Sequence, residues 1–256
     1  MGNYVTVTRK QMKNGTVCTV TIDNERKLNC LNSELLDELR LEIEVLKDDK
    51  NLAAVILTGA GDRAFIGGAD ITEMAELTPQ TAREFITRIH ELNVAIRTVS
   101  APVIARVNGI CLGAGMEIAA VCDIVIADEN ARFAMPEVHM GIPSVIEAAI
   151  LPQILGSSLT RDLVLTGRAL SAKEAHDARL VHRLASTGKL DDAVQLAVDQ
   201  ILKGGRKAVQ LQKLLCNAWE NENIPTSIQM GIDSFSSAYN STEPTRMMGA
   251  FINRKR

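Results

Sequence analysis

The sequence predicts an α/β fold, and three observations support this prediction. In the first half of the chain, short runs rich in Val, Ile and Thr alternate with stretches of helical periodicity. After about residue 143 the strand signal fades and helical patterns dominate. Hydrophobic residues make up 46% of the 256 residues, whereas the aromatic ones are only five Phe, two Tyr and one Trp. We therefore expect a large core built from aliphatic side chains.

Five strands are expected in the first half, each in a run where β-branched residues are frequent. They span Tyr4–Thr8, Thr16–Ile22, Ala53–Thr58, Pro102–Val107 and Ile124–Ala127. Two helices are expected among them, because apolar residues recur at helical spacing from Leu35 to Leu46 and from Phe85 to Val99. Each stripe predicts a helix face that packs on the core, although the near-heptad spacing of the second also allows a seam with a partner helix.

Further helices are expected in the second half. Ser171 and Glu174 have the spacing of a capping box, in which each side chain accepts a hydrogen bond from the other residue's backbone amide, and they predict a helix start. Four more helical stretches follow, near residues 189–202, 203–221, 226–240 and 244–253. Gly204 and Gly205 lie between the first two of these, as a hinge or a simple helix break.

The composition disfavours several classes of protein. Lys and Arg number 28 against 31 Asp and Glu, so the net charge of −3 gives no global attraction for nucleic acid. No apolar run approaches the roughly 20 residues that span a bilayer, and residues 1–11 lack a signal-peptide core. The five cysteines are odd in number and lack C-x-x-C spacing, which disfavours disulfides and structural zinc. We therefore expect a cytoplasmic protein that neither enters a membrane nor binds nucleic acid.

The sequence contains only partial matches to dinucleotide-binding motifs, and it lacks the motifs of metal sites and serine hydrolases. Two glycine patterns, at residues 59–64 and 113–118, resemble a dinucleotide fingerprint, but each would place a carboxylate beside the pyrophosphate. The four histidines have no metal-ligand spacing, and no G-x-S-x-G motif occurs. We therefore expect neither nucleotide-dependent redox chemistry, nor a metal site, nor a Ser-His-Asp hydrolase. His90 is interpreted as a residue at the boundary of an amphipathic helix.

Two carboxylates in apolar segments are the main candidates for chemistry. Glu117 falls in the first turn of an apolar helix that begins just after the expected strand Pro102–Val107 and a run of small residues. Glu137 lies in a second apolar segment, residues 134–141. A carboxylate among apolar neighbours tends to have a raised pKa, and two facing one pocket suit paired acid–base work. Glu117 could instead only complement the helix dipole, and the sequence leaves open whether the two carboxylates meet.

Two turns of small residues could supply backbone donors. The helix that carries Glu117 starts with free N–H groups, and residues 64–70 form a second glycine-rich turn. Two converging N–H groups would form an oxyanion hole. The plainer alternative for the second turn is a connection to the next helix, with Asp70 as its N-cap.

Taken together, these segments resemble the enoyl-CoA hydratase/isomerase family, also called the crotonase superfamily. Residues 65–70, which read F-I-G-G-A-D, resemble the family's F-x-A-G-A-D. Residues 108–117, N-G-I-C-L-G-A-G-M-E, are similar to N-G-x-x-x-G-G-G-x-E. Further similar segments are residues 23–31, 122–124, 131–133, 136–137, 165–168, 171–175 and 241–256. The resemblance spans nearly the whole chain.

The resemblance implies a spiral of ββα repeats. Residues 1–200 would form the catalytic core, and residues 201–256 a helical C-terminal region that packs in homotrimers or in hexamers made of two trimers. It also implies an acyl-coenzyme A substrate, with coenzyme A as part of the substrate rather than a separate cofactor.

The resemblance further assigns site residues. The oxyanion donors fall on the amides of Ala69 and Ala114. The two hydratase carboxylates fall on Glu117 and Glu137. The implied substrate contacts fall on three other positions, Leu28, Gly67 and Arg254, the last reaching the nucleotide end of coenzyme A from a neighbouring subunit. No metal is implied.

These residues predict syn addition of water to a trans-2-enoyl-CoA, which gives a 3-hydroxyacyl-CoA. The alternatives are a Δ3,Δ2-enoyl-CoA isomerase, which needs only Glu137, and another acyl-CoA reaction of the family. A non-catalytic RNA-binding protein is disfavoured by the charge. The segment 141–149 departs from the family pattern and is one residue shorter. It carries Ser144 in place of a glycine and a third carboxylate, Glu147, which we expect to be solvated or to cap a structural helix.

Overall fold

The computed structural model describes residues 4–254, apart from the side chain of Arg254. Its strands form two sheets, one of six strands and one of four. The larger sheet has the order β1-β2-β3-β5-β7-β10, with strands Val5–Met12, Gly15–Ile22, Leu52–Gly59, Val103–Val107, Ile124–Asp128 and Arg183–Ala185. The smaller sheet has the order β4-β6-β8-β9, with strands Ala64–Ile66, Ile110–Leu112, Arg132–Ala134 and Ala169–Ser171.

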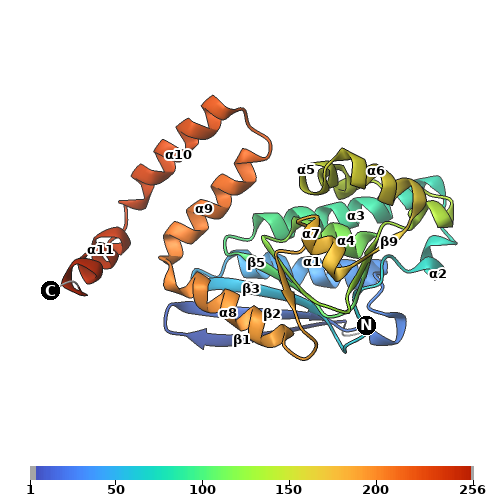
Figure 1. Ribbon diagram of the computed structural model, residues 1–256, viewed down its shortest axis with the longest axis horizontal. Coiled ribbons are helices and arrows are strands. Elements are labelled where there is room, and N and C mark those ends of the chain that lie inside the picture. Colours follow the sequence, from blue (N-terminus) through green and yellow to red (C-terminus); the bar gives the residue numbers. More distant parts are fainter. Residues whose placement is uncertain (1–3, 255–256) are drawn as a thin grey trace.

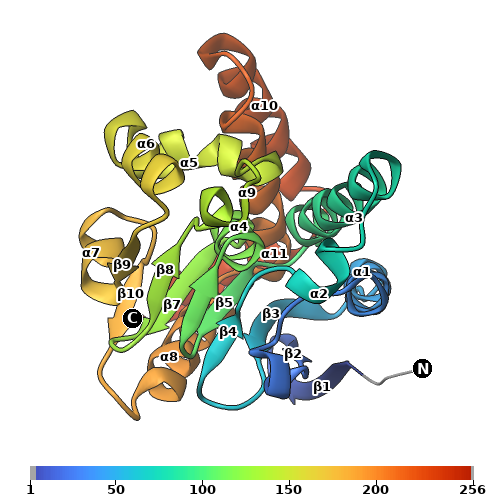
Figure 2. The same ribbon diagram turned by 90° about the vertical axis from the view of Figure 1, so that its right-hand side faces the viewer.

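From β3 to β8, successive strands alternate between the two sheets (Figures 1 and 2). β3, β5 and β7 lie side by side and parallel in the larger sheet, and the strands that follow them, β4, β6 and β8, lie parallel in the smaller one. Helices or helical turns follow each pair: α2 (Ile71–Met74) and α3 (Pro79–Thr98), then α4 (Ala114–Val121), then η2 (Glu137–Met140). The chain is therefore a spiral of strand–strand–helix repeats, and the predicted fold class is confirmed.

The two predicted amphipathic helices are also confirmed. α1 (Ser33–Lys47) buries its stripe from Leu35 to Leu46, and α3 buries the stripe that starts at Phe85. The capping box is present as well, since Ser171 Oγ accepts from the Glu174 amide and Glu174 Oε2 accepts from the Ser171 amide. The remaining helical elements are η1 (Glu25–Lys27), η3 (Ile146–Ile150), α5 (Leu151–Leu155), α6 (Ser157–Thr166), α7 (Ala172–Asp177), α8 (Leu190–Lys203), α9 (Arg206–Trp219), α10 (Ile224–Ala238) and α11 (Glu243–Arg254).

The larger sheet has a hydrophobic layer on each face. Val55, Ala105 and Val125 face α1, α3 and α4, whereas their neighbours Ala54 and Ile104 face α8 on the other side. This alternation follows from the two-residue period of a strand. Because both faces of the parallel strands are covered, they read as continuous apolar runs, which is why the sequence revealed them.

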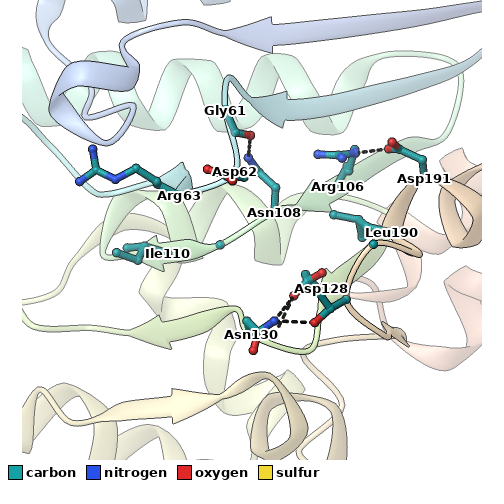
Figure 3. Close-up of a pocket in the computed structure, with 13 residues that line it drawn as sticks. Gly61, Asp62, Arg63, Arg106, Asn108, Ile110, Asp128, Asn130, Leu190 and Asp191 are labelled. Carbon is teal, nitrogen blue, oxygen red and sulfur yellow. Dashed lines mark hydrogen bonds and ion pairs between the residues drawn. The ribbon is translucent and has the colours of Figure 1, made fainter.

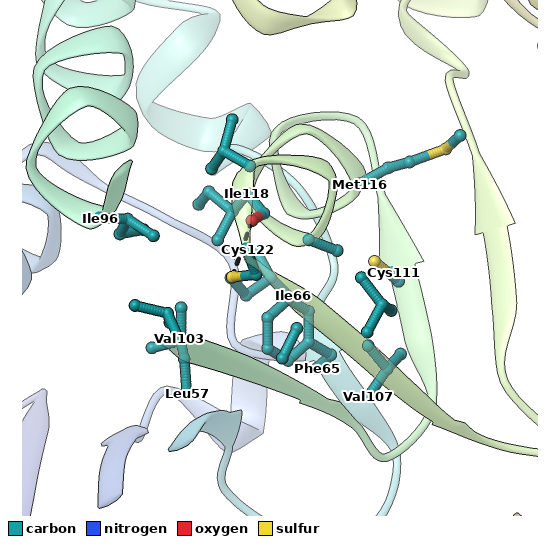
Figure 4. Packing of buried hydrophobic residues seen from close by; sticks show 14 of the residues in the cluster. Leu57, Phe65, Ile66, Ile96, Val103, Val107, Cys111, Met116, Ile118 and Cys122 are labelled. Atoms are coloured by element: carbon teal, nitrogen blue, oxygen red, sulfur yellow. Dashed lines mark hydrogen bonds between the residues drawn. The ribbon is translucent and has the colours of Figure 1, made fainter. Parts of the chain in front are cut away.

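Helix α4 is buried on nearly every side (Figure 4). Met116, Ile118 and Cys122 lie among the side chains of the core, with Phe65 and Ile66 of β4 nearby. A Cβ atom added at Gly115 would lie only 2.3 Å from the carbonyl oxygen of Ile66. The glycine therefore lets the beginning of α4 approach the end of β4, which brings two segments that carry predicted site residues together.

Five short strands are not predicted from the sequence, namely β4, β6, β8, β9 and β10. Each has only three residues, too few to show a two-residue period. β9 and β10 lie in the second half of the chain, where helices dominate as expected. The first strand is longer than expected, because Arg9–Met12 pair with β2 as one arm of a hairpin despite their polar side chains.

Helices α9, α10 and α11 extend away from the two sheets (Figure 1). Lys213 of α9 anchors them, because its side chain is 4% exposed and its Nζ lies 2.8 Å from Asp123 Oδ2 and 3.1 Å from the carbonyl oxygen of Ala101. The buried ammonium group of Lys213 thus ties the C-terminal helices to the core.

The same helix carries Cys216, which is exposed, whereas the other four cysteines are buried or partly buried.

Replacing Lys213 with Met will lower the free energy of unfolding by about 3 kcal/mol, because the half-buried carboxylate of Asp123 loses its cation. Urea unfolding monitored by circular dichroism measures the change. Lys207→Met is the matched control, since Lys207 is exposed on the same helix, and it should change stability little. Equal effects of the two substitutions would contradict the anchoring role.

No helix among residues 4–254 has the length and apolar character needed to cross a membrane. Within the same residues, no three or more His, Cys, Asp or Glu side chains gather in a way that could hold a metal ion.

Candidate active site

Five of the predicted site residues line one cavity of about 770 Å³, namely Gly67, Ala69, Ala114, Glu117 and Glu137. The cavity lies between α3, the turn after β4, the beginning of α4, and the segment from η2 to η3. Much of its wall is apolar, formed by side chains such as Met74, Leu77, Phe85, Ile86, Ile89 and Ile146. Two carboxylates, Glu117 and Glu137, open into this apolar space.

Glu117 is held deep in the wall by the first turn of α4. Its residue surface is 3% exposed, and its Oε1 accepts a 2.9 Å hydrogen bond from the backbone amide of Ala148. The pKa of Glu117 is raised to about 8, mainly by burial, while the hydrogen bond from the Ala148 amide lowers it and the nearby charges of Glu137 and Glu147 raise it. At neutral pH, Glu117 therefore carries a proton most of the time.

Glu137 begins η2 and faces the start of α4. Its Oε2 accepts a 2.7 Å hydrogen bond from Ser144 Oγ. Gly113, the N-cap of α4, has a φ of +51°, and a Cβ atom added there would lie 2.4 Å from Glu137 Oε1. Only glycine combines this backbone conformation with room for the carboxylate. The structure thus brings Glu117 and Glu137 to the same cavity, which the sequence left open.

Ala69 and Ala114 line the same cavity. Ala114 is the first residue of α4, so its N–H has no partner within the helix. Beside Ala69, the bridge to Leu31 uses the amides of Leu31 and Asp70 and leaves that of Ala69 out. Among the described residues, neither amide donates to an acceptor. Two free donors therefore border a space that contains two carboxyl groups.

The plainer interpretation of the second turn, a connection to the next helix with Asp70 as its N-cap, is confirmed. The side chain of Asp70 accepts from the amide of Thr72 at 2.9 Å and caps α2. Its other oxygen lies 2.5 Å from Lys27 Nζ. Capping by Asp70 and exposure of the Ala69 amide thus coexist, because the cap fixes the turn in which that amide lies.

The three residues predicted to contact the substrate differ in where they lie relative to the cavity. Gly67 lines the cavity. Leu28 lies behind it, where its carbonyl oxygen accepts from the Gly67 amide at 2.9 Å, and it does not reach the cavity wall. Arg254 ends α11, and its side chain lies outside the described residues.

The segment 141–149 contributes groups that the sequence analysis did not identify. Ser144 and the Ala148 amide each hold one of the two carboxylates. Glu147 is neither solvated nor a helix cap, which corrects the expectation, because it is 8% exposed and hydrogen bonded to His90 and Asn93 of α3. The one sequence feature that pointed to Glu147 was its position in an apolar run. No local pattern reveals its partners on α3.

A second cavity of about 550 Å³ lies at the carboxyl ends of β3, β5 and β7 (Figure 3). Ligands of parallel sheets often bind at such an edge. Here, however, several polar groups are already paired: Arg106 Nε lies 2.7 Å from Asp191 Oδ1, and Asn108 Nδ2 donates to the carbonyl oxygen of Gly61 at 2.6 Å, although Asn108 Oδ1 has no partner among the described residues. The larger cavity, with its raised carboxyl pKa and free amides, is the better candidate for catalysis.

The raised pKa of Glu117 predicts a pH-dependent stability. Its pKa is about 8 in the folded chain against an ordinary 4.5, so between these values the folded state holds a proton that the unfolded state releases. The free energy of unfolding therefore falls as pH rises through this window, by about 1.4 kcal/mol per pH unit from this group. Glu117→Gln cannot titrate and should gain stability relative to the native chain by that slope. Urea unfolding at several pH values measures the difference, and a constant difference would contradict the raised pKa.

Comparison with known proteins agrees with this arrangement. The family model described as enoyl-CoA hydratase/isomerase matches residues 12–256. The short-chain-enoyl-CoA hydratase of Clostridium acetobutylicum is 34% identical over 95% of this chain and 94% of its own. The crotonyl-CoA hydratase of Syntrophomonas wolfei is 31% identical over the same shares of the two chains.

Solved structures show the same fold. The crystal structure of enoyl-CoA hydratase from Bacillus anthracis is 28% identical, with a TM-score of 0.92 over 98% of this chain and 97% of that one. An enoyl-CoA hydratase from Mycobacterium smegmatis has a TM-score of 0.91 at 27% identity, over 97% and 96%. Since both the family model and the curated relatives cover nearly the whole sequence, the chain belongs to the enoyl-CoA hydratase/isomerase family.

Proposed function

We propose that this protein is an enoyl-CoA hydratase, a lyase that adds water in syn fashion to a trans-2-enoyl-CoA and forms a 3-hydroxyacyl-CoA. The observation that supports this most directly is the pair of carboxyl groups, Glu117 and Glu137, in one apolar cavity with two free backbone amides. The names of the curated relatives, which include short-chain-enoyl-CoA and crotonyl-CoA hydratases, agree with it.

The two amides would bind the thioester oxygen. The N–H groups of Ala69 and Ala114 would stabilise the negative charge that grows on this oxygen as the enolate forms. Gly67 would shape the cavity near the oxyanion, Leu28 would support it from behind through the hydrogen bond from the Gly67 amide to the Leu28 carbonyl oxygen, and Arg254 would contact the nucleotide end of coenzyme A from a neighbouring subunit. No separate cofactor is needed, because the proposed reaction uses only carboxyl groups and amides.

The two carboxyl groups would carry out the proton transfers of the reaction. Glu117 would hold the water and take one of its protons while the hydroxyl oxygen bonds to the β-carbon, and Glu137 would deliver a proton to the α-carbon. In this mechanism the pair carries a single proton in total, which Glu137 holds when the reaction begins.

A panel of enoyl-CoA esters that differ in chain length and double-bond position tests the function. Crotonyl-CoA should give 3-hydroxybutyryl-CoA, identified by chromatography and mass spectrometry. Conversion of 3-enoyl-CoA to 2-enoyl-CoA without hydration would favour the isomerase instead, which needs only Glu137. No turnover together with a mobility shift of RNA at physiological salt would favour a binding protein.

We also propose that the chain assembles as a trimer or as two trimers, through residues 201–256. Ile228, Ile232 and Phe235 are exposed at helical spacing along α10, an apolar stripe that a second copy would cover. The division between core and C-terminal region would fall near Gly204 and Gly205, between α8 and α9. Light scattering should give three or six times the 27.8 kDa of one chain, and a single-chain mass would contradict assembly.

We propose a cytoplasmic location as well. The odd number of cysteines and their spacing support a reducing compartment. Fractionation of the native cells, followed by immunodetection, would test this, and recovery from a membrane-bounded compartment would contradict it.

A further inference from the structure

The turn that holds Glu117 is itself fixed from outside the cavity. Glu147 precedes Ala148 in η3, and its side chain reaches α3. There, Glu147 Oε1 lies 2.6 Å from His90 Nδ1, and Oε2 accepts a 2.6 Å hydrogen bond from Asn93 Nδ2. His90 and Asn93 are one turn apart on α3, so both oxygens of one carboxyl group bind the same helix face.

This attachment stabilises an unfavourable backbone conformation. Ile146 has a φ of +43°, in the left-handed region that β-branched residues rarely adopt. Such a conformation persists only when its surroundings hold it in place. The Ala148 amide that closes this turn on the carbonyl oxygen of Val145 at 2.9 Å also donates to Glu117 Oε1 at 2.9 Å. One N–H therefore links the shape of the turn to the position of the carboxyl group.

Asn93 provides independent support. It is fully buried, and among the described residues its own Oδ1 has no hydrogen-bond partner. A buried amide with an unpaired oxygen is unfavourable and calls for an explanation. The donation from its Nδ2 to Glu147 supplies one, because an apolar residue at this position would leave that oxygen of Glu147 without a donor.

We infer that Glu147 is a positioning residue: together with His90 and Asn93 it fixes the left-handed turn at Ile146, so that the Ala148 amide holds Glu117 where it can act on water. This inference rests on the proposed hydratase function for its effect on turnover, but its effect on the Ala148 amide is independent of that function. Glu147 itself does not line the cavity and touches no reacting atom.

The test compares three substitutions with a control. Glu147→Ala removes the attachment, His90→Ala removes its half-exposed arm, and Glu147→Gln keeps an acceptor for Asn93. The control is Glu91→Gln, because the side chain of Glu91 is 54% exposed on the same helix and lies 4.0 Å from Arg40. Steady-state kinetics with crotonyl-CoA and NMR hydrogen exchange of the Ala148 amide are the two readouts.

We expect kcat to fall about 100-fold in Glu147→Ala and about 10-fold in His90→Ala, while KM stays within about threefold, because a misplaced group affects chemistry more than binding. The Ala148 amide should exchange at least about tenfold faster in both variants. Glu147→Gln should recover most of the kcat lost in Glu147→Ala, and Glu91→Gln should match the native chain in both readouts.

The outcomes separate the two hypotheses. Normal kcat and normal Ala148 exchange in His90→Ala and Glu147→Ala would overturn the positioning role. If Glu147→Ala fails to fold, His90→Ala still decides, since it removes only a half-exposed ring. If the native chain does not hydrate any enoyl-CoA but Ala148 exchange still responds to these substitutions, the proposed function fails and the positioning role stands.

Discussion

Replacement of Glu117 or Glu137 with glutamine is expected to lower kcat for crotonyl-CoA hydration by about 10²–10⁴-fold, the range that a single acid or base contributes. Each substitution keeps the size of the side chain and a hydrogen-bond acceptor for its holder, the Ala148 amide or Ser144. It removes only the ability to take up or release a proton. Stopped assays with coenzyme A esters, supported by circular dichroism to confirm folding, measure the loss.

The double variant gives a second criterion. Because the two groups act on one substrate as a unit, Glu117→Gln combined with Glu137→Gln should lose little more than the worse single variant. Glu84→Gln serves as control, since Glu84 is exposed on α3 and accepts a hydrogen bond from Gln80 Nε2. Near-normal hydration in either single variant would remove that residue from the mechanism. If Glu117→Gln kept full isomerisation of a 3-enoyl-CoA, the isomerase would be favoured.

The second large effect is expected from Ala114→Pro. Proline lacks the N–H group, yet the first position of a helix tolerates it well, and Ala114 holds that position in α4. The substitution therefore deletes one oxyanion donor with little change of the helix. Loss of one such donor lowers kcat by about 10²–10³-fold. Single-turnover kinetics separate this loss in the chemical step from changes in substrate binding.

Ala114→Ser is the matched control for this experiment. It adds a small side chain but keeps the amide, so kcat should remain within a few-fold of the native value. Equal losses in the proline and serine variants would mean that the side-chain position, rather than the N–H group, matters. A proline variant with native kcat would show that the Ala114 amide does not stabilise charge in the reaction.

The sequence predicts long, regular features of this fold well and short ones poorly. The buried strand Leu52–Gly59 and the helix Ser33–Lys47 repeat their periods several times, so the pattern identifies them. The strands β4, β6 and β8 have three residues each and exist because neighbouring repeats stack, which no local pattern records. Both free amides were predictable, because small residues at a helix start or tight turn leave N–H groups without local partners.

The candidate site was predictable in its components but not in its arrangement. Local composition singled out Glu117 and Glu137 as carboxylates in apolar segments, and the resemblance paired them. What holds them could not be read from the sequence: Ser144 is seven residues from Glu137, and the Ala148 amide is 31 residues from Glu117. The partners of Glu147 lie more than 50 residues away on α3. Such contacts depend on packing between repeats, and a single sequence does not encode them locally.

The thiols differ in accessibility, which allows selective chemical labelling of one of them. Cys18, Cys111 and Cys122 are buried, and burial raises the pKa of each, so all three should resist alkylation under native conditions. Cys216, by contrast, is exposed on α9 beside the anchoring Lys213. A maleimide fluorophore or nitroxide should therefore attach there first, without engineered mutations. Such a probe would report directly how the C-terminal helices move when copies of the chain assemble.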